Sequence, residues 1–383
     1  MSDFDAEESA DSLQTFTDEI FGYLPRADQR RWARVYLQGL IRVAGKKSIG
    51  RMACAAASSP TAAHGLRQFV NSSPWEWMPA RRALARLVLE RADPTAWYVS
   101  TCAIPKRGNH SVGVRRQFVA EDGRVLNCQL AAVLFLATDR VLIPVDWRLL
   151  LDERWFADDR RRRARIPASV RPQGLWAHLL DFVDDTVTSL PGGSLPLVAD
   201  IRDLGGEARA EDLIGRAQPF LLEISPTHPV GLSDRGASVT AQQLLSRPSR
   251  ELTVVRAKGP DASSRVLRST TVTPPRTLAR PFPGGGGYRL VSEHVADGRP
   301  ARYWITHRIG QPVEQTLTLI AQRSCVGNLV SELQTTFGMS DFEGRSYPGW
   351  HHHMTLVSVA YAYSRISRSV RRSTHATEIR SKC

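Results

Sequence analysis

The chain has 383 residues, which is enough for two or three domains, and its 42% hydrophobic content supports buried cores. Its formal charge of +13 favours an anionic partner such as DNA, and the alternative is a solvated arginine-rich surface. No apolar run reaches the roughly 18 residues of a membrane span, and the acidic N-terminus lacks a signal-peptide pattern. We therefore expect a cytoplasmic protein without a membrane partner, and a nucleoid-associated one if it binds DNA.

The first 92 residues are predicted to form a helical N-terminal domain. Apolar residues recur at near-helical spacing in Ser12–Leu24, Asp28–Ala44, Ser48–Ala57 and Pro79–Arg91, and prolines separate these segments. The segment Thr61–Asn71 is a candidate for a further short helix. Such a domain binds DNA or a partner protein, and the sequence does not choose between the two.

The pattern changes at Trp97 from helical to strand-like. Three segments, Trp97–Ile104, Ser111–Val119 and Val125–Leu136, have the composition of successive strands. A helix follows over Leu175–Leu190, and then a short buried strand that ends at Asp200. This order predicts the α/β class, with an RNase-H-like mixed sheet flanked by helices.

The remainder of the chain is predicted to interrupt and then complete this core. The stretch 216–318 is rich in Pro, Gly and short β-branched runs, which indicates a β-rich insertion. Helices over Cys325–Phe337 and Trp350–Ser364 then close the core. The predicted parts are the helical domain 1–92, the first part of the core 93–215, the insertion 216–318, the closing helices 319–365 and a basic tail 366–383.

Three motifs in order carry a resemblance to a known family. The first, Pro105–Val114 with Arg116–Phe118 and Asn127–Gln129, resembles the insertion-sequence 701-type group of DDE transposases, which belong to the RNase-H-like superfamily. The second begins at Leu149–Leu151, and the third joins Phe337–Met339 to Gly349–His353. The resemblance covers about residues 30–365.

The resemblance implies a site with three carboxylates. In such a site two divalent ions about 3.5–4 Å apart clamp the attacking and leaving oxygens of a phosphodiester. Mg²⁺ prefers oxygen ligands, so Asp and Glu side chains hold it. The family pattern puts the first acid on the first core strand, the second after the fourth strand and the third on a late helix.

This sequence departs from that pattern. Ungapped matches put Ser100 and Thr101 where the family has its first acids and Gly327 where it has the late Glu, so that Asp200 is the only surviving triad acid. One carboxylate cannot fix two Mg²⁺ ions, and a loss of ~5 kcal/mol in the transition state slows cleavage ~4000-fold. We expect that the ancestral Mg²⁺ site is lost, that no cofactor is held and that the chain is not a functional nuclease. We also expect the Cα atoms of Ser100, Asp200 and Gly327 to lie within about 10–12 Å of one another.

Basic side chains near the best-matched motif are candidates for phosphate contacts. Guanidinium and ammonium groups bind the DNA backbone without reading its sequence. The alternative is again a solvated surface. The predicted DNA-binding residues are Lys106, Arg107, Arg115, Arg116, Arg160, Arg161, Arg162 and Arg163.

Cysteines and histidines offer further candidate sites. Cys102 and Cys325 each lie within two residues of a degenerate triad position and are candidates to face the former cleft, although buried inert thiols are commoner. The run His351–His353 suggests a metal, but adjacent histidines of a helix point in different directions, so no metal site is predicted.

Three functions follow from these observations. The favoured one is a catalytically degenerate, domesticated or regulatory transposase-like protein that retains binding of duplex DNA but does not cleave it. In the alternative, the vacated cleft, lined by Ser100, Cys102, Asp200 and Cys325, binds or transforms a small molecule without a metal. The third is an active transposase that uses substitute acids such as Asp203 or Glu332. A homo-oligomer is compatible with all three.

Overall fold

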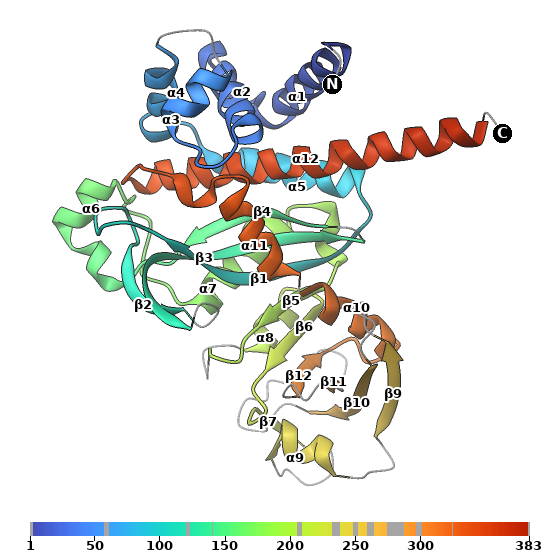
Figure 1. Cartoon of the computed structure of the whole chain (residues 1–383). Coiled ribbons are helices and arrows are strands. Elements are labelled where there is room, and N and C mark those ends of the chain that lie inside the picture. Colours follow the sequence, from blue (N-terminus) through green and yellow to red (C-terminus); the bar gives the residue numbers. More distant parts are fainter. Residues whose placement is uncertain are drawn as a thin grey trace. The chain divides into compact units, whose positions relative to one another are not determined.

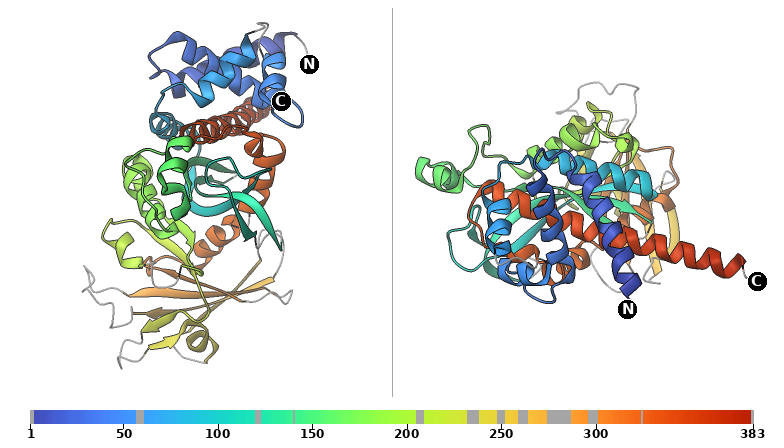
Figure 2. Two further views of the ribbon diagram at one scale, coloured as in Figure 1. Left: turned by 90° about the vertical axis from the view of Figure 1, so that its left-hand side faces the viewer. Right: turned by 90° about the horizontal axis from the view of Figure 1, so that it is seen from above.

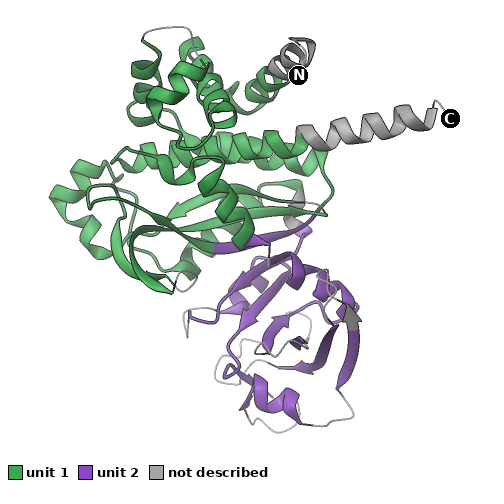
Figure 3. Cartoon of the chain, in the orientation of Figure 1, with its two compact units in different colours: residues 1–94, 101–192, 327–383 green, residues 95–100, 193–326 purple. Residues whose placement is uncertain are grey.

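A computed structural model gives the fold, and it divides into two compact units (Figure 3). Unit 1 comprises residues 1–94, 101–192 and 327–383, and unit 2 comprises residues 95–100 and 193–326. The structure describes residues 3–56, 61–119, 123–139, 141–204, 209–231, 238–247, 252–258, 264–273, 287–295, 301–323 and 325–381, and the side chains of 12–366 within them apart from 192, 193, 257 and 258.

Five helices form the N-terminal part of unit 1, as the sequence predicts. In α2 the buried Ala33, Tyr36, Leu37 and Leu40 follow helical spacing, which gives the helix one apolar face. The chain breaks between helices at prolines such as Pro25, because proline cannot donate the hydrogen bond that would continue a helix. The helices are α1 (Asp3–Phe21), α2 (Ala27–Arg42), α3 (Ile49–Ala56), α4 (Ala62–Asn71) and α5 (Trp77–Arg91).

The long helix α12 (Tyr347–Ser381) is the centre of unit 1 (Figure 1). It packs against α2, α4, α5 and strand β4 (Leu142–Leu149), and its residues 350–363 are all buried. A helix buried on every side needs apolar residues on every side, which the segment Met354–Tyr363 largely supplies. The helix starts three residues before the predicted Trp350 and continues beyond Ser364. The side chains of the predicted basic tail lie outside the described residues from 367 onward.

The strands of unit 1 include one that the sequence analysis missed. The predicted strands are present as β1 (Pro94–Pro105), β2 (Arg115–Val119) and β3 (Arg124–Thr138). Strand β4 pairs antiparallel with β3, with a register shift at Leu134/Phe135. Its sequence LIPVDWRL contains a proline and two charges that hide the strand pattern. β3 and β4, rather than β2, are thus the second and third antiparallel core strands.

Short helices connect β4 to the rest of the chain. The predicted helix Leu175–Leu190 is divided into an α-helix and a single π-helical turn. π-helical turns are rare and occur often at functional sites. The helices of this region are η1 (Glu153–Phe156), α6 (Asp158–Ala164), α7 (Leu175–Phe182) and η2 (Val183–Val187). Two further short helices of unit 1, α11 (Val326–Thr335) and η6 (Met339–Asp341), come later in the chain.

In unit 2, residues 95–100 of β1 pair with β5 (Leu197–Asp200), and β5 pairs with β6 (Phe220–Ile224), both in parallel. β6 lies inside the range assigned to the β-rich insertion, yet it continues the core sheet. Antiparallel strands follow in the order β12 (Arg302–Thr306), β11 (Tyr288–Val295), β10 (Ser264–Val272) and β9 (Thr253–Lys258).

The strand order confirms the predicted fold class. Three antiparallel strands, a helix and a strand parallel to the first are the opening of an RNase-H-like core, and here they are β1, β3, β4, α7 and β5. Helices flank the strands in each unit (Figure 2). Those of unit 2 are α8 (Ala210–Ile214), α9 (Ala241–Ser246) and α10 (Val313–Arg323), and α9 follows the small hairpin of β7 (Pro229–Gly231) and β8 (Ser238–Thr240). No described helix meets the length and hydropathy needed to cross a bilayer.

Candidate catalytic centre and nucleic-acid surface

Asp200 is the last residue of β5, and two arginines hold its carboxylate. Arg202 donates from Nη2 to Oδ2 at 2.7 Å and from Nε to Oδ1 at 3.0 Å, and Arg323 donates from Nη2 to Oδ2 at 2.7 Å. Burial by itself raises the pKa of Asp200, but the hydrogen bonds from Arg202 and the charge of Arg323 bring that pKa below its usual value. The carboxylate is therefore ionised and already neutralised by guanidinium groups.

A second acid, Glu223, lies beside Asp200 on the neighbouring strand β6. The two residues are register partners, and Glu223 is fully buried. Arg302 donates to its two carboxylate oxygens at 2.9 and 2.8 Å, and the guanidinium groups of Arg323 and Arg202 lie 3.4 and 3.5 Å away. Two carboxylates thus share three guanidinium groups, one of which, that of Arg302, also lies 3.7 Å from Glu293.

The sequence analysis missed Glu223, although the position of this acid within an apolar strand could have identified it. It is the single acid in the apolar strand Phe220–Ile224, where a charge without a partner would cost several kcal/mol. An acid in the middle of a strand of this kind predicts a buried cation, and three arginines supply it. Of the substitute acids considered instead, Glu332 pairs with Arg365, whereas Asp203 is in the turn after β5, where its charge acts on Arg202.

The degenerate first position lies beside Asp200. β1 and β5 are parallel and pair Val99 with Ala199, so the next residues of the two strands, Ser100 and Asp200, lie next to each other where β5 ends. Thr101 points to the opposite face of β1, because side chains alternate along a strand. Cys102 is buried, with 6% of its surface exposed.

Gly327 is the second residue of α11, as the alignment to a late helix requires. A Cβ added at this position would meet no atom within 4 Å, so the glycine is not required by crowding. Cys325 is exposed just before the helix. Later in α11, Gln334 donates from Nε2 to the carbonyl oxygen of Ala103 on β1 at 3.0 Å. The separation of Gly327 from Asp200 stays a prediction.

Among the basic residues of the first motif, Lys106 differs from the arginines. Its Nζ donates to the carbonyl oxygens of Ser340 and Phe342 at 2.9 and 3.0 Å, and burial lowers its pKa to about 8. Lys106 therefore binds the protein itself. Arg107 and Arg116 are exposed, and Arg115 is half-buried against Gln117.

The arginine run lies on α6, and its four members have different surroundings. Arg161 donates to the carbonyl oxygens of Pro167 and Val170, while Arg162 pairs with Asp159 at 2.5 Å. Arg160 lies over the ring of Trp155, with 5.8 Å between its Cζ and the ring centroid. Arg160, Arg162 and Arg163 are exposed. The helix thus presents guanidinium groups to solvent.

A comparison of the sequence with models of protein families shows to which family this chain belongs. The model of the DDE superfamily endonuclease family matches residues 19–227, more than half of the chain. The chain belongs to this DDE superfamily endonuclease family. Its fold is also similar to a chain of the cryo-EM structure of the piggyBac transposase synaptic complex with hairpin DNA, at 8% identity and a TM-score of 0.41, over 96% of this chain and 74% of that chain. Among curated proteins, none matches the sequence.

The three adjacent histidines of this DDE superfamily member are buried in α12, each with partners of its own. His351 contacts Arg81, His352 lies between the carbonyl oxygens of Val70 and Trp75, and His353 contacts Tyr36. Burial lowers the pKa of each histidine. They point in different directions, as the helical spacing predicts. Among the described residues, no group of three or more His, Cys, Asp or Glu side chains is arranged to hold a metal ion.

A buried ion pair connects three elements of unit 1. Arg81 of α5 and Asp146 of β4 are both fully buried, 2.7 Å apart between Nη1 and Oδ1. Arg81 also donates to the carbonyl oxygen of Trp147 at 2.8 Å and to Thr355 Oγ1 of α12 at 2.8 Å. Burial raises the pKa of Asp146, but Arg148 and Arg81 outweigh it and bring that pKa below its usual value.

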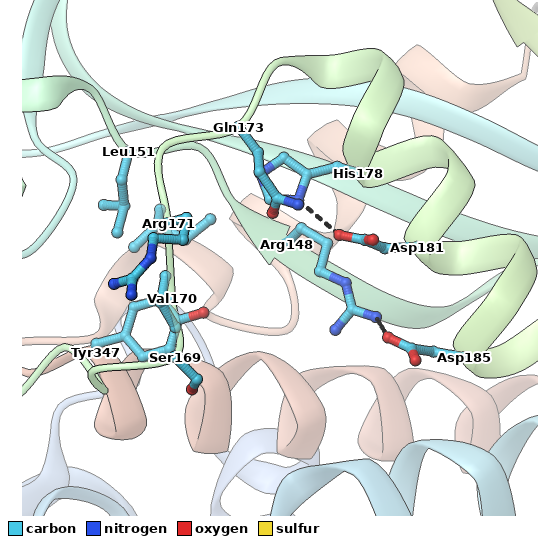
Figure 4. Close-up of a pocket in the computed structure, with 11 residues that line it drawn as sticks. Arg148, Leu151, Ser169, Val170, Arg171, Gln173, His178, Asp181, Asp185 and Tyr347 are labelled. Atoms are coloured by element: carbon cyan, nitrogen blue, oxygen red, sulfur yellow. Dashed lines mark hydrogen bonds and ion pairs between the residues drawn. The ribbon is translucent and has the colours of Figure 1, made fainter.

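A pocket of about 300 Å³ lies next to this ion pair (Figure 4). Arg148 reaches from β4 to Asp185 of the π-helical turn, 2.8 Å between Nη2 and Oδ2. Burial and the charge of Arg148 lower the pKa of His178 to about 4, so that its imidazole is neutral. The lining residues are Arg148, Leu149, Leu151, Ser169, Val170, Arg171, Gln173, His178, Asp181, Asp185 and Tyr347. Ser100, Cys102, Asp200 and Cys325 are not among them.

Proposed function

We propose that this chain is a domesticated or regulatory transposase-like protein that binds duplex DNA and does not cut it by the two-metal reaction. One observation carries the second half of this proposal: the carboxylate of Asp200 is occupied by Arg202 and Arg323. Membership of the endonuclease family supports the first half.

The residues around Asp200 do not fit a pair of Mg²⁺ ions. Such ions need several carboxylate oxygens, whereas Ser100 supplies a neutral hydroxyl and Glu223 is bound by Arg302 at both oxygens. Three guanidinium groups would also repel an incoming divalent cation. We therefore derive no cleavage step through a metal at this position.

Cleavage is tested with the full-length protein and supercoiled plasmid in Mg²⁺ or Mn²⁺. We expect no nicking. Nicking by the wild type that disappears in Asp200→Ala would show that Glu223 or another acid has replaced the missing ligands, and would overturn this half of the proposal. The double variant Ser100→Asp, Gly327→Glu should bind Mn²⁺ more tightly than the wild type in calorimetry. A Cβ added at Gly327 would meet no atom within 4 Å, so the substitution begins in open space.

DNA binding is supported by exposed arginines that lie away from Asp200 in the sequence. If five side chains contact phosphates, the slope of log affinity against log salt is about −4.5, and affinity falls roughly 500-fold between about 50 and 200 mM salt. The double variant Arg160→Glu, Arg163→Glu removes two of these contacts and should reduce the fall to roughly 40-fold.

The matched control is the double variant Arg171→Glu, Arg256→Glu, which makes the same change of net charge at exposed arginines that are not predicted DNA-binding residues. Arg107 is not used because it is itself a candidate. Fluorescence anisotropy of labelled duplex DNA measures each affinity. Equal slopes for the α6 variant and the control would remove α6 from the interface. Undetectable binding by the wild type at about 50 mM salt would refute retained DNA binding.

A second candidate function, small-molecule binding, is favoured by the pocket at His178 rather than by the predicted cleft. The pocket combines guanidinium, carboxylate, imidazole and phenol groups, and several of them have shifted pKa values, which is common at functional sites. A thermal-shift screen of metabolites, with Arg171→Ala as the comparison, tests it. A ligand that stabilises both proteins equally would place its site elsewhere.

A further inference from the structure

The hairpin of β2 and β3 presents an unusual apolar pair to solvent. Phe118 is 64% exposed and Val125 is 52% exposed, and Phe118 has the highest exposure among the large hydrophobic side chains of the described residues. The two are register partners, so their side chains lie next to each other on one face of the hairpin. Beyond this end of the hairpin, β3 is buried from Cys128 to Thr138, apart from the half-buried Leu130. The exposed pair is therefore not part of the core.

Two exposed arginines, Arg116 and Arg107, lie near this pair in the chain fold. Arg116 lies two residues before Phe118 and so points to the same face of β2. Asn127, opposite Arg116, donates from Nδ2 to the carbonyl oxygen of Gly108 at 2.7 Å. This hydrogen bond ties the turn that carries the exposed Arg107 to the base of the hairpin. The face thus combines the exposed guanidinium group of Arg116 with an exposed aromatic ring, and the exposed Arg107 lies in the turn tied to it.

We propose that this face of the β2–β3 hairpin binds DNA at an unstacked base, with Phe118 stacking on the base while Arg107 and Arg116 hold the neighbouring phosphates. Aromatic rings that stack on bases, inside a positively charged surface, are the usual means of binding single-stranded nucleic acid. The inference rests on the proposed DNA binding and adds the kind of DNA, a duplex with a single-stranded extension.

Charge decides between DNA and a second copy of this chain. A symmetric contact between two copies would place the same face of each against the other. Both faces would then carry the positive charges of Arg107 and Arg116, and burying like charges in one interface would oppose association. The DNA backbone carries the complementary charge.

The probe is a duplex with a short single-stranded extension that contains 2-aminopurine, whose fluorescence falls when it stacks on an aromatic ring. We expect the wild type to quench this fluorescence. Phe118→Ala should abolish the quenching and weaken binding about tenfold, while Phe118→Trp should retain both. Arg116→Ala should instead reduce the salt slope by about 0.9. Val254→Ala, at another valine that is 52% exposed, is the control for loss of an exposed apolar side chain.

Failure of this inference is distinguishable from failure of the proposed function. Binding and quenching that are equal in the wild type and Phe118→Ala would overturn the stacking role and leave DNA binding intact. Loss of a dimer in Phe118→Ala, measured by sedimentation, would assign the face to self-association and also overturn the inference. No binding of any duplex by the wild type would refute the proposed function itself. Unchanged melting temperatures would show that the variants are folded, as expected for an exposed position.

Discussion

Replacement of His353 by Gln should remove part of the acid sensitivity of unit 1. The neutral imidazole has a polar partner at each ring nitrogen: one nitrogen lies 2.9 Å from the Tyr36 hydroxyl and the other 3.1 Å from the carbonyl oxygen of Gly338. Burial lowers the pKa of His353 to about 3, whereas an unfolded histidine has a pKa of about 6.5. Below pH 6.5, His353 therefore binds a proton in the unfolded chain but not in the folded protein.

The sign of the effect follows from this difference. The folded-state pKa is depressed, so the contribution of His353 is fully present above about pH 6.5 and is lost as the pH falls toward the folded value. Between pH values of about 7.5 and 5, linkage gives a loss of about 2 kcal/mol for this one group. The other buried histidines add losses of their own, which cancel when the wild type is compared with the variant.

Urea denaturation at the two pH values measures the effect. The wild type should lose about 2 kcal/mol more unfolding free energy than His353→Gln. The variant at exposed His110, His110→Gln, serves as the control and should behave like the wild type. Equal losses in the wild type and His353→Gln would refute the reasoning, because they would mean that His353 takes up its proton in the folded state.

Two further substitutions test the packing of unit 1. Arg81→Met leaves Asp146 buried without its partner and should cost about 3–5 kcal/mol in urea denaturation, and adding Asp146→Leu should recover much of the loss; a cost below about 1 kcal/mol would contradict the role of the ion pair. Gly338 has φ +68°, and an added Cβ would lie 2.4 Å from Cγ of Lys47, so Gly338→Ala should cost at least about 1–2 kcal/mol by the same assay. Gly123→Ala, with φ +63° and open space, isolates the backbone contribution, and equal costs would show that the Lys47 contact is unimportant.

The N-terminal helices could be predicted because their apolar residues recur at helical spacing, and β3 because it contains a continuous apolar run of strand length. Strand β4 could not, because Asp146 and Arg148 interrupt its pattern, and their partners Arg81 and Asp185 lie on other elements, 65 and 37 residues away in the sequence. The arginines around Asp200 were hidden for the same reason. Arg302 and Arg323 come from distant segments, and only folding brings them to Asp200 and Glu223.

The placement of helix α12 has a consequence for synthesis on the ribosome. The helices α2, α4 and α5 bury their apolar faces against a segment that is translated more than 250 residues later. At ordinary translation rates those apolar faces stay without their partner for roughly tens of seconds. Unit 2 is fully synthesised before α12 and can fold first. Unit 1 is therefore the part of this protein that we expect to depend on chaperones, and fragments that stop before Tyr347 should be recovered mainly as aggregates.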